Sequence, residues 1–125
     1  MDREIISTDD APRSPAYSQA VRAAGLVFVS GQGPLDPATG QVAGTTIQER
    51  TRQCLRNVEA ILTAAGSSME RVVSATFILR DPADFAGFNE EWLRWFPTDQ
   101  PARQGARHPL DVDGQTISIA VIALA

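Results

Sequence analysis

The segment from Thr116 to Ala125 constrains the fold most strongly, because it is apolar on both faces of a predicted strand. Side chains alternate along a strand, so one face receives Ile117, Ile119, Val121 and Ala123, and the other receives Ala120, Ile122 and Leu124. Both faces need cover, since monomers seldom keep a large apolar patch exposed. If the rest of the chain covers only one of these faces, we therefore expect the other face to contact another subunit.

Two amphipathic helices are predicted. The first begins at Thr46, with Glu49 three residues later as a capping box, and its helically spaced apolar residues continue to Gly66. Cys54 lies in that stripe, which predicts a buried small side chain and not a reactive thiol. The second helix begins at Asp81 with proline in its first turn. Two helices cover only one face of a sheet, so an oligomer is expected.

The apolar stripe of the second helix is aromatic and consists of Phe85, Phe88, Trp92, Trp95 and Phe96. We interpret these rings as packing onto a sheet. Asn89 lies among them, and its place in the packing or in a cleft is open at this point.

Five further segments are predicted to be strands: residues 1–8, 17–22, 26–32, 72–79 and a segment starting at Ala102. Ala24-Gly25 predicts a tight turn between the second and third strands, and another turn is expected at 111–114. The order of elements predicts an α+β domain spanning residues 1–125, with a mixed sheet of about six strands and two helices on one face.

Composition excludes several classes of function. The formal charge is −4, and all eleven basic residues are arginine, so nothing favours nucleic acid as a partner. One cysteine and one histidine are too few to supply the ligands of a zinc site, and the acidic residues do not have the spacing of a calcium-binding loop. No metal is therefore predicted. Without an apolar run long enough for a membrane span or a signal peptide, a cytoplasmic protein with no membrane partner is expected.

The segment from Gln100 to His108 is the candidate for chemistry, because it carries two arginines and the one histidine. As a strand it places Arg103, Gly105 and Arg107 on one face. A guanidinium beside an unobstructed glycine backbone suits a small carboxylate. Taken alone, these residues favour the plainer interpretation of Arg103 as an edge-strand arginine in an ion pair.

Several separated motifs favour a functional role for Arg103 over the ion-paired edge residue. They are Ala16–Ala20, Val29–Gln32, Pro34–Gly40, Gln53–Asn57, Ala64–Ser68, Asp84-Phe85 with Asn89-Glu90, and Pro101–Arg103. In combination they resemble the RidA/YjgF family of enamine/imine deaminases. The resemblance runs nearly end to end. It implies a chorismate-mutase-like fold and a homotrimer whose sheets enclose a barrel, with clefts between neighbouring subunits.

The resemblance also implies an activity, the hydrolysis of 2-aminoacrylate or 2-iminopropionate to a 2-keto acid and ammonia. Arg103 matches the arginine that holds the substrate carboxylate, while Tyr17, Ser30, Gly31 and Asn89 match positions that line the same cleft. Such imines hydrolyse unaided, so fixing the carboxylate and stabilising charge are enough, with no cofactor or covalent nucleophile.

Two departures keep a second function open. Deaminating members carry a glutamate that helps to place the water, and Ser118 stands at that position here; Gly105 replaces a position that is often cysteine. His108 and Asp111 are possible substitutes for the acid. The alternative to a deaminase is therefore a trimeric carboxylate-binding or regulatory module without strong turnover. RNA cleavage is disfavoured, because there is no basic stripe with interleaved aromatics.

Overall fold

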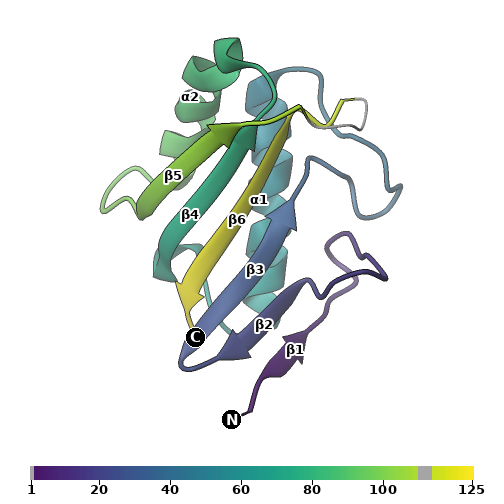
Figure 1. Cartoon of the computed structure of the whole chain (residues 1–125), viewed down its shortest axis with the longest axis vertical. Helices are drawn as coiled ribbons and strands as arrows, with labels where there is room; N and C mark the ends of the chain where they lie inside the picture. The colour runs from purple at the N-terminus through teal and green to yellow at the C-terminus, as the bar shows by residue number, and fades with distance from the viewer. Residues whose placement is uncertain (1, 110–113) are drawn as a thin grey trace.

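The computed structural model describes residues 2–109 and 114–125. Its strands are β1 (Glu4–Ile6), β2 (Ala20–Ala23), β3 (Leu26–Gln32), β4 (Val72–Leu79), β5 (Ala102–Arg107) and β6 (Ile117–Leu124). Its helices are α1 (Ile47–Ala64) and α2 (Phe85–Trp95), with short 3-10 turns η1 (Met69–Arg71) and η2 (Pro82–Asp84). The strands form one sheet in the order β1-β2-β3-β6-β4-β5 (Figure 1). Only the β4–β5 pair is parallel among these strands, and the predicted mixed α+β architecture is confirmed.

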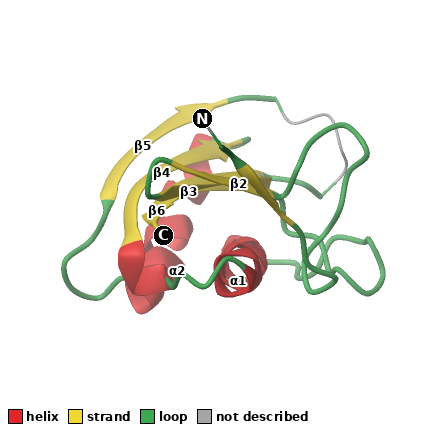
Figure 2. Cartoon of the chain, turned by 90° about the horizontal axis from the view of Figure 1, so that it is seen from below, coloured by secondary structure: helices red, strands yellow, loops and turns green. Residues whose placement is uncertain are grey.

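Both helices lie on the same side of the sheet, as Figure 2 shows in a view along the layers. Strand β6 is central, between β3 and β4, so the last segment of the chain organises the sheet. The side chains of Ile117, Ile119, Val121 and Ala123 point to the helices and are at most 2% exposed. The helices therefore bury one of the two apolar faces of β6.

The opposite face of the sheet is open in the single chain. On β6 it carries Ala120 and Ile122, which are half-buried, and Leu124, which is 48% exposed. Phe28 of β3 pairs with Ile122 and is 40% exposed. In the single chain, therefore, only one of the two apolar faces of β6 is buried. The apolar residues of the other face remain accessible.

Helix α1 begins as the sequence predicts. Thr46 Oγ1 accepts a hydrogen bond from the Glu49 backbone N–H at 3.1 Å, and Glu49 Oε1 accepts from the Thr46 backbone N–H at 3.1 Å. These bonds satisfy two of the free donors at the helix start. The helix ends before Gly66, whose φ of +77° is a conformation that glycine adopts without strain. Cys54 is fully buried, which confirms the sequence interpretation.

Several boundaries differ from the prediction, and the first strand, expected over 1–8, covers only Glu4–Ile6. Strand β2 begins at Ala20 and not Tyr17, because the Gln19 side chain bonds the loop carbonyls of Thr8, Ala11 and Pro12 and fixes the preceding chain to that loop. Helix α2 begins at Phe85, because the first turn after Asp81 is the 3-10 turn η2. The turn expected at 111–114 falls mostly outside the described residues.

Candidate functional site

Strand β5 lies at one edge of the sheet, next to β4 (Figure 1), and carries Arg103. The Arg103 side chain is on the helix side, since it bonds Asn89 of α2. In the parallel register with β4, Arg103 pairs with Ala75, Gly105 with Phe77, and Arg107 with Leu79. Ala75, Phe77 and Leu79 are all buried. The predicted face shared by Arg103, Gly105 and Arg107 is confirmed, and it adjoins helix α2.

Helix α2 gives Arg103 its polar partner. Arg103 Nη1 donates a hydrogen bond to Asn89 Oδ1 at 2.8 Å. Within residues 2–109 and 114–125 Arg103 forms no ion pair, so the plainer interpretation of an ion-paired edge arginine finds no support there. A guanidinium has five N–H donors in a fixed plane, and the bond to Asn89 uses one of them. Asn89, whose role the sequence left open, thus orients the cation.

Four aromatic rings surround the same guanidinium. Its Cζ lies 5.0 Å from the ring centre of Phe77, 5.8 Å from Phe85, 5.1 Å from Phe88 and 5.1 Å from Trp92. At such distances the ring faces attract a cation. Burial lowers the pKa of Arg103 from its ordinary value, yet an arginine at neutral pH stays protonated. The result is a charged and partly desolvated donor group held in place.

These rings are the part of the site that the sequence analysis missed. The helical spacing of Phe85, Phe88 and Trp92 around Asn89 was the available signal, but it is also the spacing of a buried stripe. Phe88 and Trp92 do pack on the sheet, at 0% and 3% exposure, so the packing interpretation was correct and incomplete. Phe77 comes from β4, and only the strand register brings it to Arg103.

Gly105 is explained by the ring of Phe77. A Cβ atom added at Gly105 would stand 2.1 Å from Phe77 Cζ, a distance that real Cβ atoms do not reach. The aromatic ring therefore occupies the space that a side chain at position 105 would need. The small residue on β5 and the large residue on β4 fit one another.

A pocket of about 360 Å³ opens next to the guanidinium. It is lined by Asn89, Trp92, Leu93, Gln100, Pro101 and Arg103. The Arg103 guanidinium and the side-chain amides of Asn89 and Gln100 are among the polar groups there, so the pocket is suited to a small anion with hydrogen-bond acceptors.

The remaining predicted residues lie elsewhere in the single chain. A Cβ at Gly31 would stand 2.9 Å from Ser118 Oγ, so these two residues share the open face of the sheet. Ser30 Oγ donates to the Ser18 carbonyl at 2.6 Å, which fixes the loop beside Tyr17, itself 57% exposed. The structure thus places Gly31 beside Ser118, and it attaches Ser30, the neighbour of Gly31 in β3, to the loop that carries Tyr17.

These two groups of predicted residues are apart. Strands β6 and β4 separate β3 from β5, a span of roughly 14 Å at the usual strand spacing. Ser118 pairs with Ile78 and faces away from the helices, whereas Arg103 faces α2. One chain therefore does not unite Arg103 with Gly31 and Ser118. His108 is exposed, and Asp111 lies outside the described residues.

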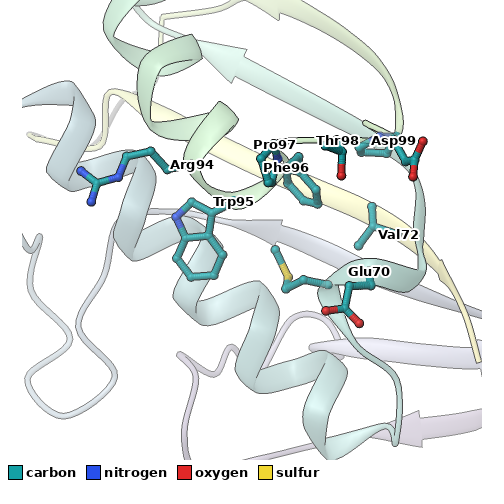
Figure 3. Close-up of a pocket in the computed structure, with 10 residues that line it drawn as sticks. Glu70, Val72, Arg94, Trp95, Phe96, Pro97, Thr98 and Asp99 are labelled. Carbon is teal, nitrogen blue, oxygen red and sulfur yellow. The ribbon is translucent and has the colours of Figure 1, made fainter.

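A second pocket, of about 440 Å³, lies on the other side of Pro101, which lines both pockets. Figure 3 shows it between the turn that carries Glu70 and the segment from Trp95 to Asp99 that leaves α2. None of the residues predicted to be functional lines it, so the candidate site remains the pocket at Arg103.

Within residues 2–109 and 114–125, no three His, Cys, Asp or Glu side chains are grouped so that they could hold a metal ion. No helix in them combines the length and apolar character needed to cross a bilayer.

Comparisons with known proteins agree on one family. Residues 8–124 match the family profile described as Endoribonuclease L-PSP. A RutC family protein of Pyrococcus horikoshii is 42% identical over 88% of this chain and 90% of its own length. The 2-iminobutanoate/2-iminopropanoate deaminase of Rattus norvegicus is 38% identical over 98% and 90%. The crystal structure of E. coli TdcF with bound serine is 32% identical, with a TM-score of 0.90 and 98% of each chain covered.

Proposed function

The chain belongs to the RidA/YjgF/RutC family, and from this premise we propose that it hydrolyses small 2-imino or 2-enamino acids to 2-keto acids and ammonia. The observation that carries the proposal is the Arg103 guanidinium, oriented by Asn89 and four rings beside an open pocket. That arrangement suits the carboxylate which such substrates share. The deaminase name of the rat relative supports the reaction class.

The proposed reaction needs little from the protein. Arg103 binds the carboxylate through paired N–H donors, which fixes the adjacent C=N carbon in one orientation. A water oxygen forms a bond to that carbon, the π electrons move to nitrogen, and one proton of the water is transferred to that nitrogen to give a carbinolamine. The hydroxyl proton of the carbinolamine then moves to the nitrogen as the C–N bond breaks, which releases ammonia and leaves the carbonyl of the 2-keto acid. Positioning and charge stabilisation supply the rate enhancement.

We further propose that the complete site forms between subunits of a homotrimer. Arg103 and Asn89 lie on the helix side of the sheet, and Gly31 and Ser118 lie on its open face. A neighbouring subunit can bring its own Tyr17, Ser30, Gly31 and Ser118 to the Arg103 pocket, which one chain does not do. The open apolar face supports assembly, because it carries Phe28, Ile122 and Leu124. The serine bound by TdcF supports a ligand of amino-acid size here.

The second candidate function is a trimeric module that binds or senses small carboxylates without strong turnover. Ser118 favours it, because a serine hydroxyl does not serve as a water-activating carboxylate at this position. Both functions use Arg103 in the same way, so a binding measurement does not separate them.

An assay of imine decay tests the proposal. An amino acid oxidase generates 2-iminopropionate from alanine, and semicarbazide captures the imine that has not yet hydrolysed. We expect wild-type protein to reduce semicarbazone formation and Arg103→Ala to lose that effect. Wild-type protein that leaves semicarbazone formation unchanged, while still binding pyruvate, would contradict the deaminase and favour the binding module.

A further inference from the structure

The pocket of about 440 Å³ beyond Pro101 has an apolar wall that belongs to the core of the protein. Val72 and Phe96 line it and are only 7% and 5% exposed. Met69 and Trp95 also line it, and both pack against the core. An apolar cavity of roughly 150 Å³ is enough to hold benzene. This pocket therefore has room for a ring or a branched hydrocarbon group against a fixed apolar surface.

The charged side chains around this pocket are divided between its two ends. Glu70 comes from η1 and Asp99 from the segment after α2, and Figure 3 shows both at one end of the pocket. Arg94 of α2 lies at the opposite end, with Trp95 and Phe96 between them. Within residues 2–109 and 114–125, none of these three charged groups forms an ion pair. One end of the pocket is therefore negative and the other positive.

This distribution of charge favours a cation bound at the negative end. The carboxylates of Glu70 and Asp99 attract a positive group, and Arg94 repels it from the other end. The Thr98 hydroxyl also lines the pocket, and its oxygen can accept a hydrogen bond from an ammonium. A free α-amino acid does not match this arrangement, because its ammonium and carboxylate are attached to the same carbon. The formal charge of −4 on the whole chain also attracts cations.

The pocket adjoins the Arg103 pocket without being part of it. Pro101 is the one residue that lines both spaces. Each space has its own tryptophan, Trp95 in the larger pocket and Trp92 in the Arg103 pocket. The chain contains only these two tryptophans, so their indole N–H groups can report on the two pockets separately.

We propose that the larger pocket is a second small-molecule site, which binds an amphipathic amine: a primary ammonium attached to an aromatic or branched hydrocarbon group. The ammonium lies at the end formed by Glu70, Asp99 and the Thr98 hydroxyl, and the hydrocarbon group packs on Trp95 and Phe96. The site takes no part in the hydrolysis of imines. The proposal is therefore independent of the proposed function.

NMR spectroscopy of the indole N–H signals tests the proposal with 2-phenylethylamine as the probe. The variant Trp95→Phe assigns the two signals. We expect the amine to shift the Trp95 signal in a saturable way, with a dissociation constant in the millimolar range or below, and to leave the Trp92 signal in place. The anion 3-phenylpropionate has a similar hydrocarbon group but a carboxylate in place of the ammonium, and it should not shift the Trp95 signal.

Charge-neutral variants test the negative end of the pocket. Glu70→Gln and Asp99→Asn retain the shapes of the side chains, and asparagine tolerates the left-handed φ of +49° at residue 99. The double variant should weaken amine binding roughly tenfold or more, because hydrogen bonds to charged groups are lost. Arg94→Gln should leave the affinity unchanged or increase it. Glu90→Gln is the matched control, since Glu90 is exposed on α2 but does not line the pocket.

Several results would overturn the proposal. They are a Trp95 signal that the amine does not shift, an equal shift with 3-phenylpropionate, and full affinity in the double variant. A shift of the Trp92 signal alone would place the amine in the Arg103 pocket and would overturn the proposal as well. Each single variant should weaken binding several-fold, which gives a measurement if the double variant does not fold. All these readouts report binding, so failure of the imine assay leaves them unaffected.

Discussion

Arg103 has a role that depends on the shape of its side chain as well as its charge. One N–H of the planar guanidinium bonds Asn89 Oδ1, and the plane lies among four rings. Lysine has the same charge but is a compact ammonium with no planar fork. It would neither reproduce paired hydrogen bonds to a carboxylate nor pack against the rings as a plane.

We therefore predict that Arg103→Lys is nearly as harmful as Arg103→Ala. Each should weaken carboxylate binding by roughly 2–5 kcal/mol, the range for truncating one partner of a buried charged pair. Titration of pyruvate followed by calorimetry measures this loss. Full retention of binding by Arg103→Lys would show that the fork geometry is unimportant.

Cys54 is a packing residue. Its side chain is fully buried in α1, and its Sγ lies 3.9 Å from the Ile117 carbonyl oxygen of β6. Burial raises the pKa of the Cys54 thiol well above its ordinary value, because the thiolate would lose its hydration. Only the thiolate is the nucleophile in thiol chemistry.

The native protein is therefore expected to resist thiol-specific reagents up to about pH 9, where an ordinary cysteine with a pKa near 8.5 is largely ionised. Labelling with a chromogenic disulfide should be complete in denaturant and negligible in buffer. Rapid labelling of the folded protein at pH 8 would mean that the thiol is accessible.

At the scale of elements, a polar link joins the two helices. Glu91 of α2 is 3% exposed and accepts hydrogen bonds from Arg52 Nη2 of α1 at 3.0 Å and from Trp95 Nε1 at 3.0 Å. Burial alone would raise the pKa of Glu91, but the bonds from Arg52 and Trp95 and the charge of Arg52 outweigh burial and lower the pKa below its ordinary value. The link fixes the position of α2, and hence of Asn89, relative to the sheet.

Glu91→Gln should cost roughly 3 kcal/mol of unfolding free energy at pH 7, the lower end for breaking a buried pair, since Arg52 is one-third exposed. A lowered carboxyl pKa contributes stability that is full above the unfolded-state pKa and disappears as pH falls through the folded-state pKa. The difference between wild type and variant should therefore shrink below about pH 4.5.

Urea denaturation across pH 2–7 measures that dependence. Glu90→Gln is the matched control, because Glu90 is exposed on the same helix and surface changes usually stay within about 0.5 kcal/mol. A constant Glu91→Gln difference over the whole pH range would rule out the ion pair as its source.

A second element-scale link explains one of the sequence motifs. Asn57 is 1% exposed on α1, and its amide donates to the carbonyls of Gly33 at 3.2 Å and Leu35 at 2.8 Å. These bonds attach the loop after β3 to the helix. Asn57, the last residue of the motif Gln53–Asn57, thus contributes to the position of the loop that follows β3.

At the scale of the whole molecule, the open face of the sheet predicts assembly with other copies, and the family resemblance makes a closed trimer the expected form. Its exposed apolar side chains would be buried against the equivalent faces of other copies. Light scattering at micromolar concentration should give three times the 13.5 kDa chain mass. A mass near 13.5 kDa would contradict the trimer and the shared site together.

Such an assembly would also make Ser118 part of the neighbouring site. Ser118→Glu should then raise turnover of 2-iminopropionate, because a carboxylate that orients or deprotonates water contributes roughly 10²–10⁴-fold. The imine assay on a variant that remains trimeric measures the gain. Unchanged turnover in a well-folded trimer would indicate that another group already positions the water.

The sequence by itself determined the elements, because their signals are local. Short runs rich in β-branched and other apolar residues predicted β3, β4 and β6, and the Thr46–Glu49 capping box with its helical stripe predicted α1. Arg103 and Asn89 were also identified, since short motifs of the chain carry them. These features depend on neighbours within a few residues, which is the range over which a sequence pattern is informative.

Only the tertiary structure decided what surrounds Arg103 and which predicted residues meet. Phe77 reaches the guanidinium because β4 and β5 pair in parallel with Phe77 beside Gly105, a register set by packing between distant segments. The same pairing places Ser118 and Arg103 on opposite faces, although both lie on predicted strands. Strand neighbours and sheet faces follow from long-range burial and hydrogen bonding, which a local pattern does not encode.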